Sequence, residues 1–464
     1  MTKKSDRRRR AKRAESHLER VNLFAAGIDI GSRSHFVAVA EDLDEQPVRE
    51  FACFTGDLHR MADWLVELGI ETVAMESTGV YWIPAYEILE ARGLEVLLVD
   101  ARHVKNVPGR KSDVLDCQWL QQLHTYGLLR GAFRPPEEMV VLRAYLRQRD
   151  GLIRSRSDCV RHMQKALRQM NLLLDNVVSD ITGATGMGII RAILAGERDA
   201  RVLAQLRDRR CRADQRTIAG SLEGHYREEH LFALGQAVEC YDFYHRQIEA
   251  CEQAIERHLQ RMDSDGEGGG SGEPPPPSKP AGHSKNGLSF DARSHLYRLI
   301  GVDLTAINGM SESSALAFLA ETGSDMSAWP SEKHFASWLG LSPGSKVSGG
   351  KRLSGKSKPV ANRAAEVLRL AAYSLANSHC ALGAYYRRLR ARLGAPKANT
   401  ATAHKLARII YRMLKHRTPF VDPGQDYYEQ QYRERVTRNL TRRARAMGLQ
   451  LVPISDSENQ ESMA

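Results

Sequence analysis

The chain has 464 residues, of which 42% are hydrophobic and 27% are charged, a composition typical of a folded globular protein with two or three domains. No apolar run approaches the ~20 residues that cross a bilayer, and the seven cysteines form no C-x-x-C pair. A membrane protein, a zinc module and a disulfide scaffold are therefore excluded, and a reducing cytoplasm is expected. Lys and Arg outnumber Asp and Glu by 67 to 56, with arginines gathered in the last quarter, which indicates a polyanionic partner or, as the alternative, only a basic solvated surface.

The first part of the chain alternates strand and helix patterns after a basic arm over 1–22. Apolar or alternating runs predict strands, and apolar residues at helical spacing predict helices. In chain order these are strands 23–31, 35–42 and 47–56, helix 57–69, strand 71–78, helix 82–93, strand 94–101 and helix 112–127. Three meandering strands followed by strand–helix units predict a ribonuclease H-like α/β domain over 23–136.

The remainder of the chain is predicted to be mainly helical. Long amphipathic patterns over 141–174 and 231–262 predict a helical, coiled-coil arm over 137–262, with a plain helical bundle as the alternative. A Gly/Ser/Pro-rich stretch predicts a flexible linker over 263–293. A mainly helical domain over 294–420 and a basic tail over 421–464 complete the chain.

Acidic residues recur at matching places in the first domain. Asp29 lies in the middle of the first apolar strand, Glu76 near the end of the fourth, and Asp113 and Asp116 three residues apart on one helix face. In the predicted strand order these four carboxylates would approach one another, and their repulsion would require a cation. One or two Mg²⁺ ions are expected, because this ion prefers oxygen ligands and a pair of ions assists phosphodiester exchange.

Other interpretations of these acids stay open at this point. Asp29 could cap a turn, Glu76 could begin the next helix, and Asp113 could be a first-turn acid that the helix dipole stabilises. A sugar kinase or actin-like ATPase also carries an acid at the centre of such a strand, where it holds a nucleotide phosphate. That class needs a second, duplicated phosphate-binding half, and the sequence beyond 262 offers only a proline-rich stretch and helices.

A serine-rich basic loop follows later, over 340–358. Ser345, Ser348 and Ser354 are interspersed with lysines and an arginine, so a serine hydroxyl beside a phosphodiester could act as a nucleophile. The alternative is a flexible basic loop that only contacts phosphate. The residues expected to contact nucleic acid are Lys111, Lys346, Lys351, Arg352, Lys356, Lys358 and Arg363.

Three blocks resemble one known family. "GIDIGSRSHFVAVA", the long block from "AMESTGVYW" through "GRKSDVLDCQWLQQL", and "FASWLGLSPGSKVSGGK" are similar to the bridge-RNA-guided transposases of bacterial insertion sequences, in the family numbered one hundred and ten. The resemblance extends over residues 25 to about 420.

The resemblance implies a RuvC-like domain with a DEDD metal site, a helical arm and a serine transposase domain. The DEDD residues fall on Asp29, Glu76, Asp113 and Asp116, and the catalytic serine falls on Ser348, before Gly349. It further implies donor and target double-stranded DNA, a structured guide RNA, a dimer or tetramer, and a bacterial cytoplasmic, nucleoid-associated location. A junction-resolving endonuclease that uses only the acids and a non-catalytic RNA/DNA-binding scaffold are the alternative functions.

Overall fold

The computed structural model describes residues 19–77, 79–99, 113–265, 273–276, 284–344, 346–355, 357 and 362–452. The chain divides into two compact units, Met1–Arg134 and Pro135–Ala464, and each is described by itself.

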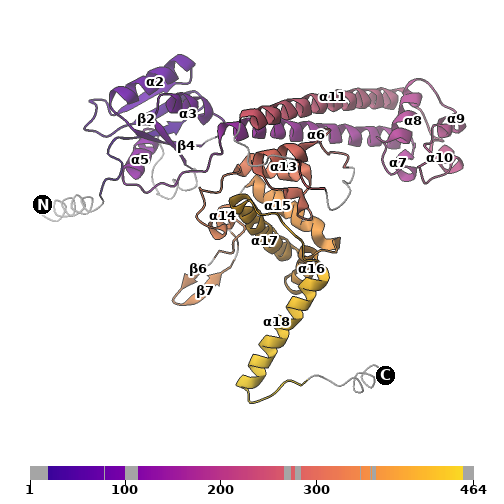
Figure 1. Ribbon diagram of the computed structural model, residues 1–464. Coiled ribbons are helices and arrows are strands. Elements are labelled where there is room, and N and C mark those ends of the chain that lie inside the picture. The colour runs from indigo at the N-terminus through magenta and orange to yellow at the C-terminus, as the bar shows by residue number, and fades with distance from the viewer. Residues whose placement is uncertain are drawn as a thin grey trace, which may run out of the picture. The chain divides into compact units, whose positions relative to one another are not determined.

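The first unit is built on a five-stranded sheet (Figure 1). Its spatial order is β3-β2-β1-β4-β5, in which β1 pairs antiparallel with β2 and β2 with β3, whereas β1–β4 and β4–β5 are parallel. The strands are β1 (Ala25–Ile30), β2 (Ser34–Ala38), β3 (Val48–Ala52), β4 (Thr72–Glu76) and β5 (Glu95–Val99). A meander followed by parallel strands confirms the predicted α/β architecture of this domain.

Helices cover both faces of this sheet. The unit contains α2 (Thr55–Glu67), α3 (Trp82–Ala91) and α5 (Asp113–Thr125). Side chains alternate between the faces of a strand, and the apolar set of β1 and β4, which includes Ile28 and Met75, joins one core with Met61 of α2 and Leu89 of α3. The opposite set, which includes Asp29, faces α5. The acids therefore lie on the face away from the main core.

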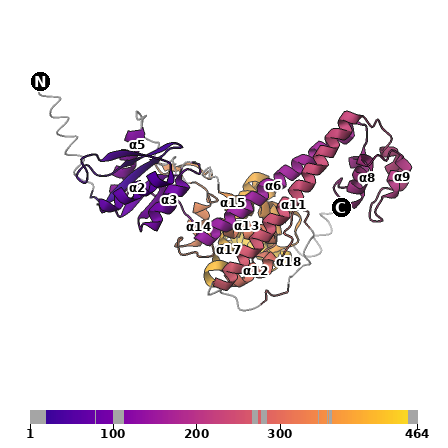
Figure 2. The ribbon, with the colours of Figure 1, turned by 90° about the horizontal axis from the view of Figure 1, so that it is seen from above.

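The second unit begins with a long helical hairpin. Helices α6 (Glu137–Gln169) and α11 (Glu228–Asp265) pack along each other, and the short helices at their far end are α7 (Leu174–Val177), α8 (Ala184–Leu194), α9 (Ala200–Gln205) and α10 (Gln215–Ser221) (Figure 2). An apolar cluster that includes Met163, Ile190 and Leu234 joins the hairpin to this helical tip. The predicted arm is helical, and its coiled-coil character stays a prediction.

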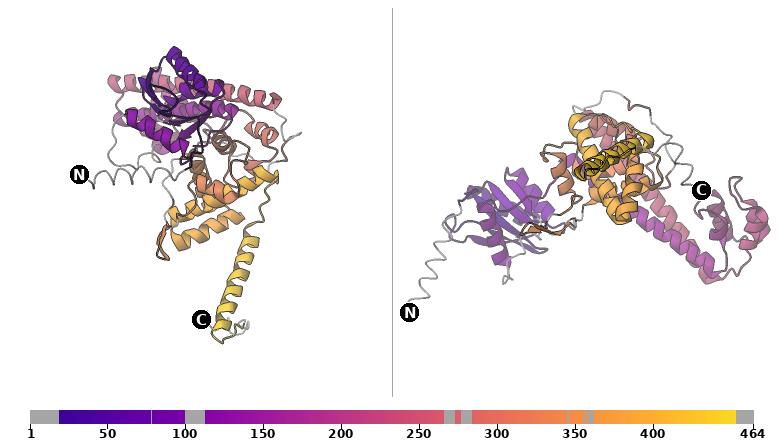
Figure 3. Two further views of the ribbon diagram at one scale, coloured as in Figure 1. Left: turned by 90° about the vertical axis from the view of Figure 1, so that its left-hand side faces the viewer. Right: turned by 90° about the horizontal axis from the view of Figure 1, so that it is seen from below.

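The rest of the second unit is a helical bundle with one small hairpin (Figure 3). Its helices are α12 (Ala292–Ile300), η2 (Leu304–Ala306), α13 (Glu312–Thr322), α14 (Glu332–Trp338), α15 (Arg363–Ser374), η3 (Leu375–Asn377), α16 (Ala381–Leu393), α17 (Ala395–His416) and α18 (Gln425–Ala446). The two-stranded hairpin consists of β6 (Lys346–Ser348) and β7 (Lys351–Ser354). α12 packs on α11 and α13 packs on α6, so this bundle rests on the base of the arm.

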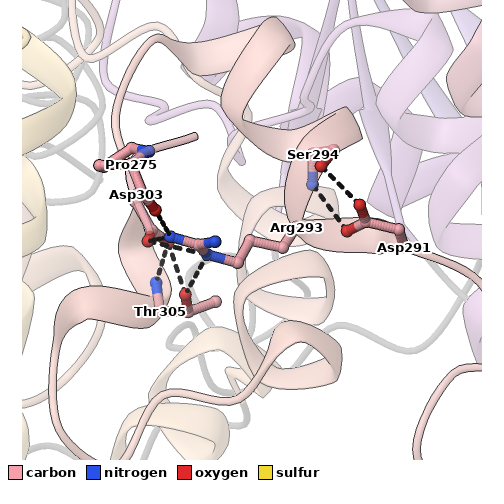
Figure 4. A network of polar contacts seen from close by, with 6 residues as sticks. All are labelled: Pro275, Asp291, Arg293, Ser294, Asp303 and Thr305. Atoms are coloured by element: carbon pink, nitrogen blue, oxygen red, sulfur yellow. Dashed lines mark hydrogen bonds and ion pairs between the residues drawn. The ribbon is translucent and has the colours of Figure 1, made fainter. Parts of the chain in front are cut away.

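The predicted linker over 263–293 differs from the structure at both ends. α11 continues to Asp265 and α12 begins at Ala292, so both borders are helical. Next to α12, the Arg293 guanidinium binds Asp303 and Thr305 and donates a hydrogen bond to the carbonyl of Pro275 at 2.5 Å (Figure 4). Arg293, at the start of α12, therefore binds the backbone of the proline-rich segment at Pro275. Residues 266–272 and 277–283 lie outside the described residues.

The segment predicted as a basic tail over 421–464 contains a helix, α18. Its sequence has a weak apolar periodicity, which is why the helix was not predicted. Within the described part of the chain, no helix is both long enough and apolar enough to span a membrane.

Candidate nucleic-acid processing site

Two of the predicted acids lie side by side on neighbouring strands. The parallel register of β1 and β4 pairs Gly27 with Ala74 and Ile28 with Met75, so the next step along both strands brings Asp29 beside Glu76. Residues paired in register point to the same face of a sheet. Asp29 and Glu76 are both half-buried and point to the face that α5 covers.

Helix α5 crosses this face with its first turn near the two acids. Near its end, the Gln121 side chain lies 3.5 Å from the carbonyl oxygen of Ala25, at the start of β1. His124 lies 2.9 Å from the Thr72 hydroxyl, at the start of β4. The helix therefore runs opposite to both strands, and its beginning lies toward their carboxyl ends, where Asp29 and Glu76 stand.

The pKa of the buried Cys117 thiol responds to two of these carboxylates. Burial raises the pKa of Cys117, the negative charges of Asp29 and Asp116 act in the same direction, and together they bring it to about 12. Electrostatic effects of this kind require short distances. Asp116, on the first turn of α5, and Asp29, on β1, therefore lie close to the same buried thiol.

Asp113 is the first residue of α5, one helical turn before Cys117. Its side chain lies outside the described part of the structure, as does Lys111. Among the described side chains, no three His, Cys, Asp or Glu residues form a metal-binding group. The described donors that approach each other are carboxylates, the ligands that Mg²⁺ prefers over softer metals, so their chemistry fits this ion.

Gly27 is a residue of this site that the sequence analysis missed. A Cβ atom at this position would lie 2.3 Å from the backbone nitrogen of Gln121 and 2.5 Å from the carbonyl oxygen of Cys117. Only glycine lets the α5 backbone approach β1 so closely. The signal was present, because a glycine inside an apolar strand often marks a close backbone approach.

Ser348 lies in the second unit, at the tip of the β6–β7 hairpin. It is exposed and paired across the strands with Lys351, while Gly349 and Gly350 form the turn with φ values of 55° and 73°. Positive φ at both central residues is typical of a type I′ turn. The segment that was predicted as a loop is therefore a hairpin, whose cross-strand pairing places a hydroxyl and an ammonium group on one face.

The other predicted residues around this hairpin divide into two groups. Arg363 is exposed at the start of α15, and Ser354 is half-buried at the end of β7. Lys346 and Arg352 lie on the strands, but their side chains are outside the described part. Ser345, Lys356 and Lys358 are also outside it.

Both units match known transposase families. Residues 26–172 match a transposase model, the DEDD transposase of IS110. Residues 303–387 match the transposase IS116/IS110/IS902 family. The chain is a transposase of the IS110 family. No curated protein matches the chain significantly.

The family assignment confirms that this IS110 transposase is a DNA transposase/recombinase, with DNA as its substrate. Its first match covers the sheet with Asp29 and Glu76, α5 and the first arm helix, and its second covers the bundle with Ser348. A DEDD domain implies use of a divalent metal in general terms.

Proposed function

We propose that this transposase cuts and rejoins the DNA of an insertion sequence with Mg²⁺-binding acids and a serine nucleophile, guided by a structured bridge RNA. The observation that carries the proposal is the placement of Asp29 beside Glu76 on one sheet face, under the helix that begins with Asp113 and bears Asp116. This placement supports the proposal, because a RuvC-like metal site requires strand and helix carboxylates on the same side of the sheet.

In this proposal, Asp29, Glu76, Asp113 and Asp116 hold Mg²⁺. The bound ion would supply Lewis-acid stabilisation of the charge on the reacting phosphodiester. Asp29, Glu76 and Asp116 are all half-buried, so their carboxylates are partly accessible to solvent and ions. The sheet and α5 fix these side chains before DNA binds, as pre-organised catalysis requires.

Ser348 is the proposed nucleophile. Its hydroxyl loses a proton, its oxygen bonds to phosphorus, and a deoxyribose oxygen leaves and takes up a proton. The phosphoserine link keeps the bond energy, so a second strand's hydroxyl can displace the serine and rejoin DNA without ATP. The exposed tip position and the neighbouring Lys351 ammonium support this role, because a cation beside the hydroxyl attracts the phosphate.

The serine is tested by trapping a covalent protein–DNA adduct on a labelled duplex of the element's end. Ser348→Ala should abolish the adduct and keep DNA binding, whereas Ser354→Ala, on the neighbouring strand, should keep both. An adduct of undiminished yield from Ser348→Ala would exclude this serine. DNA cleavage that continues without any adduct would favour the junction endonuclease, which uses only the acids.

The acids are tested by Mg²⁺ binding and by strand exchange. Asp29→Asn should lose both the calorimetric Mg²⁺ signal and exchange. Asp42→Asn, an exposed acid of the same unit, should keep them. Normal Mg²⁺ binding by Asp29→Asn would refute the metal assignment. Firm DNA binding by a wild-type protein that never exchanges strands would favour the scaffold.

The guide RNA is tested by sequencing the RNA that copurifies with the protein. A single structured species encoded beside the gene, with segments complementary to donor and target DNA, would support the proposal. A random sample of cellular RNA would oppose it. RNA pairing accounts for sequence choice by a protein whose basic helices have no recognised base-reading arrangement.

A further inference from the structure

The second half of α18 concentrates positive charge without compensation. Residues 435–446 contain five arginines and neither an acidic residue nor a lysine. All five side chains are exposed, and no described residue forms a salt bridge with them. Like charges three or four residues apart on a helix repel one another, so this segment destabilises itself unless an anion binds.

Four of these arginines form one line along the helix. Arg435, Arg438, Arg442 and Arg445 are spaced three, four and three residues apart, which keeps them within about 80° of the helix circumference at 3.6 residues per turn. At about 1.5 Å of rise per residue the line is ~15 Å long. We name these four residues the arginine stripe.

The root of α18 is firmly attached to the bundle. The Arg388 guanidinium of α16 lies 3.3 Å from the ring centroid of Tyr432 and 5.3 Å from that of Tyr428. The Lys405 ammonium of α17 lies 5.6 Å from the Tyr428 ring. Cation–π contacts of this kind with partly buried partners are worth roughly 1–2 kcal/mol each. α18 is therefore held at its base in a defined direction.

Beyond this root, α18 projects from the other helices of its unit (Figures 1 and 3). Ala444 is its only buried residue, so the distal half has few packing contacts that would stabilise it. A helical segment with a narrow apolar face and few tertiary contacts is only marginally stable in water. Because the root is fixed and the distal half is charged, a bound polyanion would stabilise this half of the helix.

We propose that the arginine stripe of α18 binds the phosphate backbone of double-stranded DNA. Duplex DNA carries one negative charge per ~1.7 Å of axis, so a stripe ~15 Å long faces about nine phosphates. Tyr432 lies beside Arg435, but residues 436–446 contain no aromatic side chain on which an unpaired base could stack, and this disfavours single strands. The contact is independent of sequence and lies outside the acids and serine of the proposed chemistry.

A second copy of the chain fits the arginine stripe less well than DNA does. The face opposite the stripe bears only Val436 and Leu440 as larger aliphatic side chains between the tyrosines and the helix end, and Ala444 is already buried. Two copies of α18 packed together would also bring two uncompensated arginine segments into proximity. Charge complementarity therefore favours DNA.

The test compares two charge-matched double variants of the full-length protein. R438Q/R442Q removes two members of the stripe, and R433Q/R443Q removes two exposed arginines of the same helix from other faces. Fluorescence anisotropy measures the affinity for a duplex of arbitrary sequence, about 30 base pairs long, across a range of KCl concentrations.

We expect R438Q/R442Q to weaken duplex binding roughly tenfold and to reduce the slope of log affinity against log salt by about 1.8, that is, about 0.9 for each phosphate contact. R433Q/R443Q should change the slope by less than half as much. R438K/R442K should retain the wild-type slope, and circular dichroism of each variant checks the helix content.

Three results would overturn the proposal. Equal losses in both glutamine variants would mean that only net charge matters. A larger loss for a structured RNA than for the duplex would assign the stripe to RNA. Unchanged duplex binding together with a change of mass in light scattering would assign it to a second copy.

Discussion

The carbonyl oxygen of Cys117 lies 2.5 Å from the point at which a Cβ atom on Gly27 would stand. This contact joins the backbone of α5 directly to that of β1. Asp29 follows Gly27 by two residues on the same strand face, and Asp116 directly precedes Cys117. The distance between two backbones therefore determines how closely two carboxylates of the candidate metal site approach.

Substitution Gly27→Ala should force α5 away from β1. The added Cβ would clash with backbone atoms, which cannot rotate away, so the first unit should lose about 1–3 kcal/mol of stability or more. Mg²⁺ affinity should also fall, because the helix carries two of the proposed ligands. Hydrogen exchange of the β1 amides measures the first effect and calorimetry measures the second.

Gly151→Ala is the control for this substitution. Gly151 lies within α6, and no atom lies within 4 Å of its would-be Cβ. Alanine there should stabilise the helix by about 0.5–1 kcal/mol. If Gly27→Ala left the β1 amides as well protected as Gly151→Ala does, the close packing of α5 on β1 would be refuted.

His124 should make the first unit sensitive to acid. Burial lowers the pKa of His124 below its usual 6.5, and the ring lies 2.9 Å from the Thr72 hydroxyl in the neutral form. The unfolded chain binds the proton more tightly than the folded one. The stabilisation is therefore complete above about pH 6.5 and is lost as the pH falls toward the lower pKa of the folded state.

The measurement is the drop in unfolding midpoint between pH 7.5 and pH 5. His124→Gln should show a smaller drop than the wild type, even if its midpoint at pH 7.5 is lower. His59→Gln, which removes an exposed histidine of the same unit, should keep the wild-type drop. An identical drop in the His124 variant would show that this histidine does not contribute. His35 is also buried with a lowered pKa and should account for part of the remaining effect.

The sheet and its acids were readable from the sequence because their signals are local. An apolar run that is interrupted only by Asp29 predicts a strand. Period-two alternation then places Asp29 on the sheet face opposite to that of Ile28. The order of strands and helices supplied the topology. The direction of α5 across the sheet was not readable, because it depends on the contacts of Gln121 and His124 with residues far away in the chain.

The hairpin and α18 were missed for different reasons. The segment around Gly349 and Gly350 was predicted as a loop, although two adjacent glycines between short polar strands also fit a type I′ turn. In its second half α18 has only a narrow apolar face with Val436, Leu440 and Ala444, and the periodicity on which helix prediction depends is therefore weak. Its helix is rooted through aromatic and cationic side chains, such as Tyr432 and Arg388, whose pairing the sequence does not reveal.

The buried Arg149–Glu252 pair should be essential for the arm. Arg149 donates to Glu252 at 2.7 Å and to the carbonyls of Asn286 and Gly287, both at 2.9 Å, and both charged side chains are only 5% exposed. Arg149→Met leaves the Glu252 carboxylate buried without its cation, which should cost about 3–5 kcal/mol. Hydrogen exchange of the α6 and α11 amides measures this loss.

Two further variants separate the pair's charge from its packing. R149M/E252L removes both charges and should recover much of the lost stability, because apolar side chains can replace a buried ion pair. Arg161→Ala breaks the exposed Arg161–Asp158 pair of the same helix and should cost less than about 1 kcal/mol. A double variant as unstable as Arg149→Met would show that the bonds to 286 and 287 dominate.

The turn beside Ser348 should tolerate only residues that accept positive φ. Gly349 has φ of 55° and open space around its would-be Cβ, so the effect of a side chain there is conformational and not steric with neighbours. Asparagine is favoured at the first central position of a type I′ turn, whereas a β-branched residue is strongly disfavoured at positive φ. Gly349→Asn should therefore preserve the hairpin, and Gly349→Val should open it.

The adduct assay described for Ser348 reports the consequence. Gly349→Val should lower the yield of covalent protein–DNA adduct while duplex affinity stays within about twofold, and Gly349→Asn should retain both. The left-handed conformation costs a non-glycine residue about 1–2 kcal/mol, enough to shift most molecules out of a short hairpin. Equal yields from the valine and asparagine variants would mean that the serine reacts from a loop whose turn geometry is irrelevant.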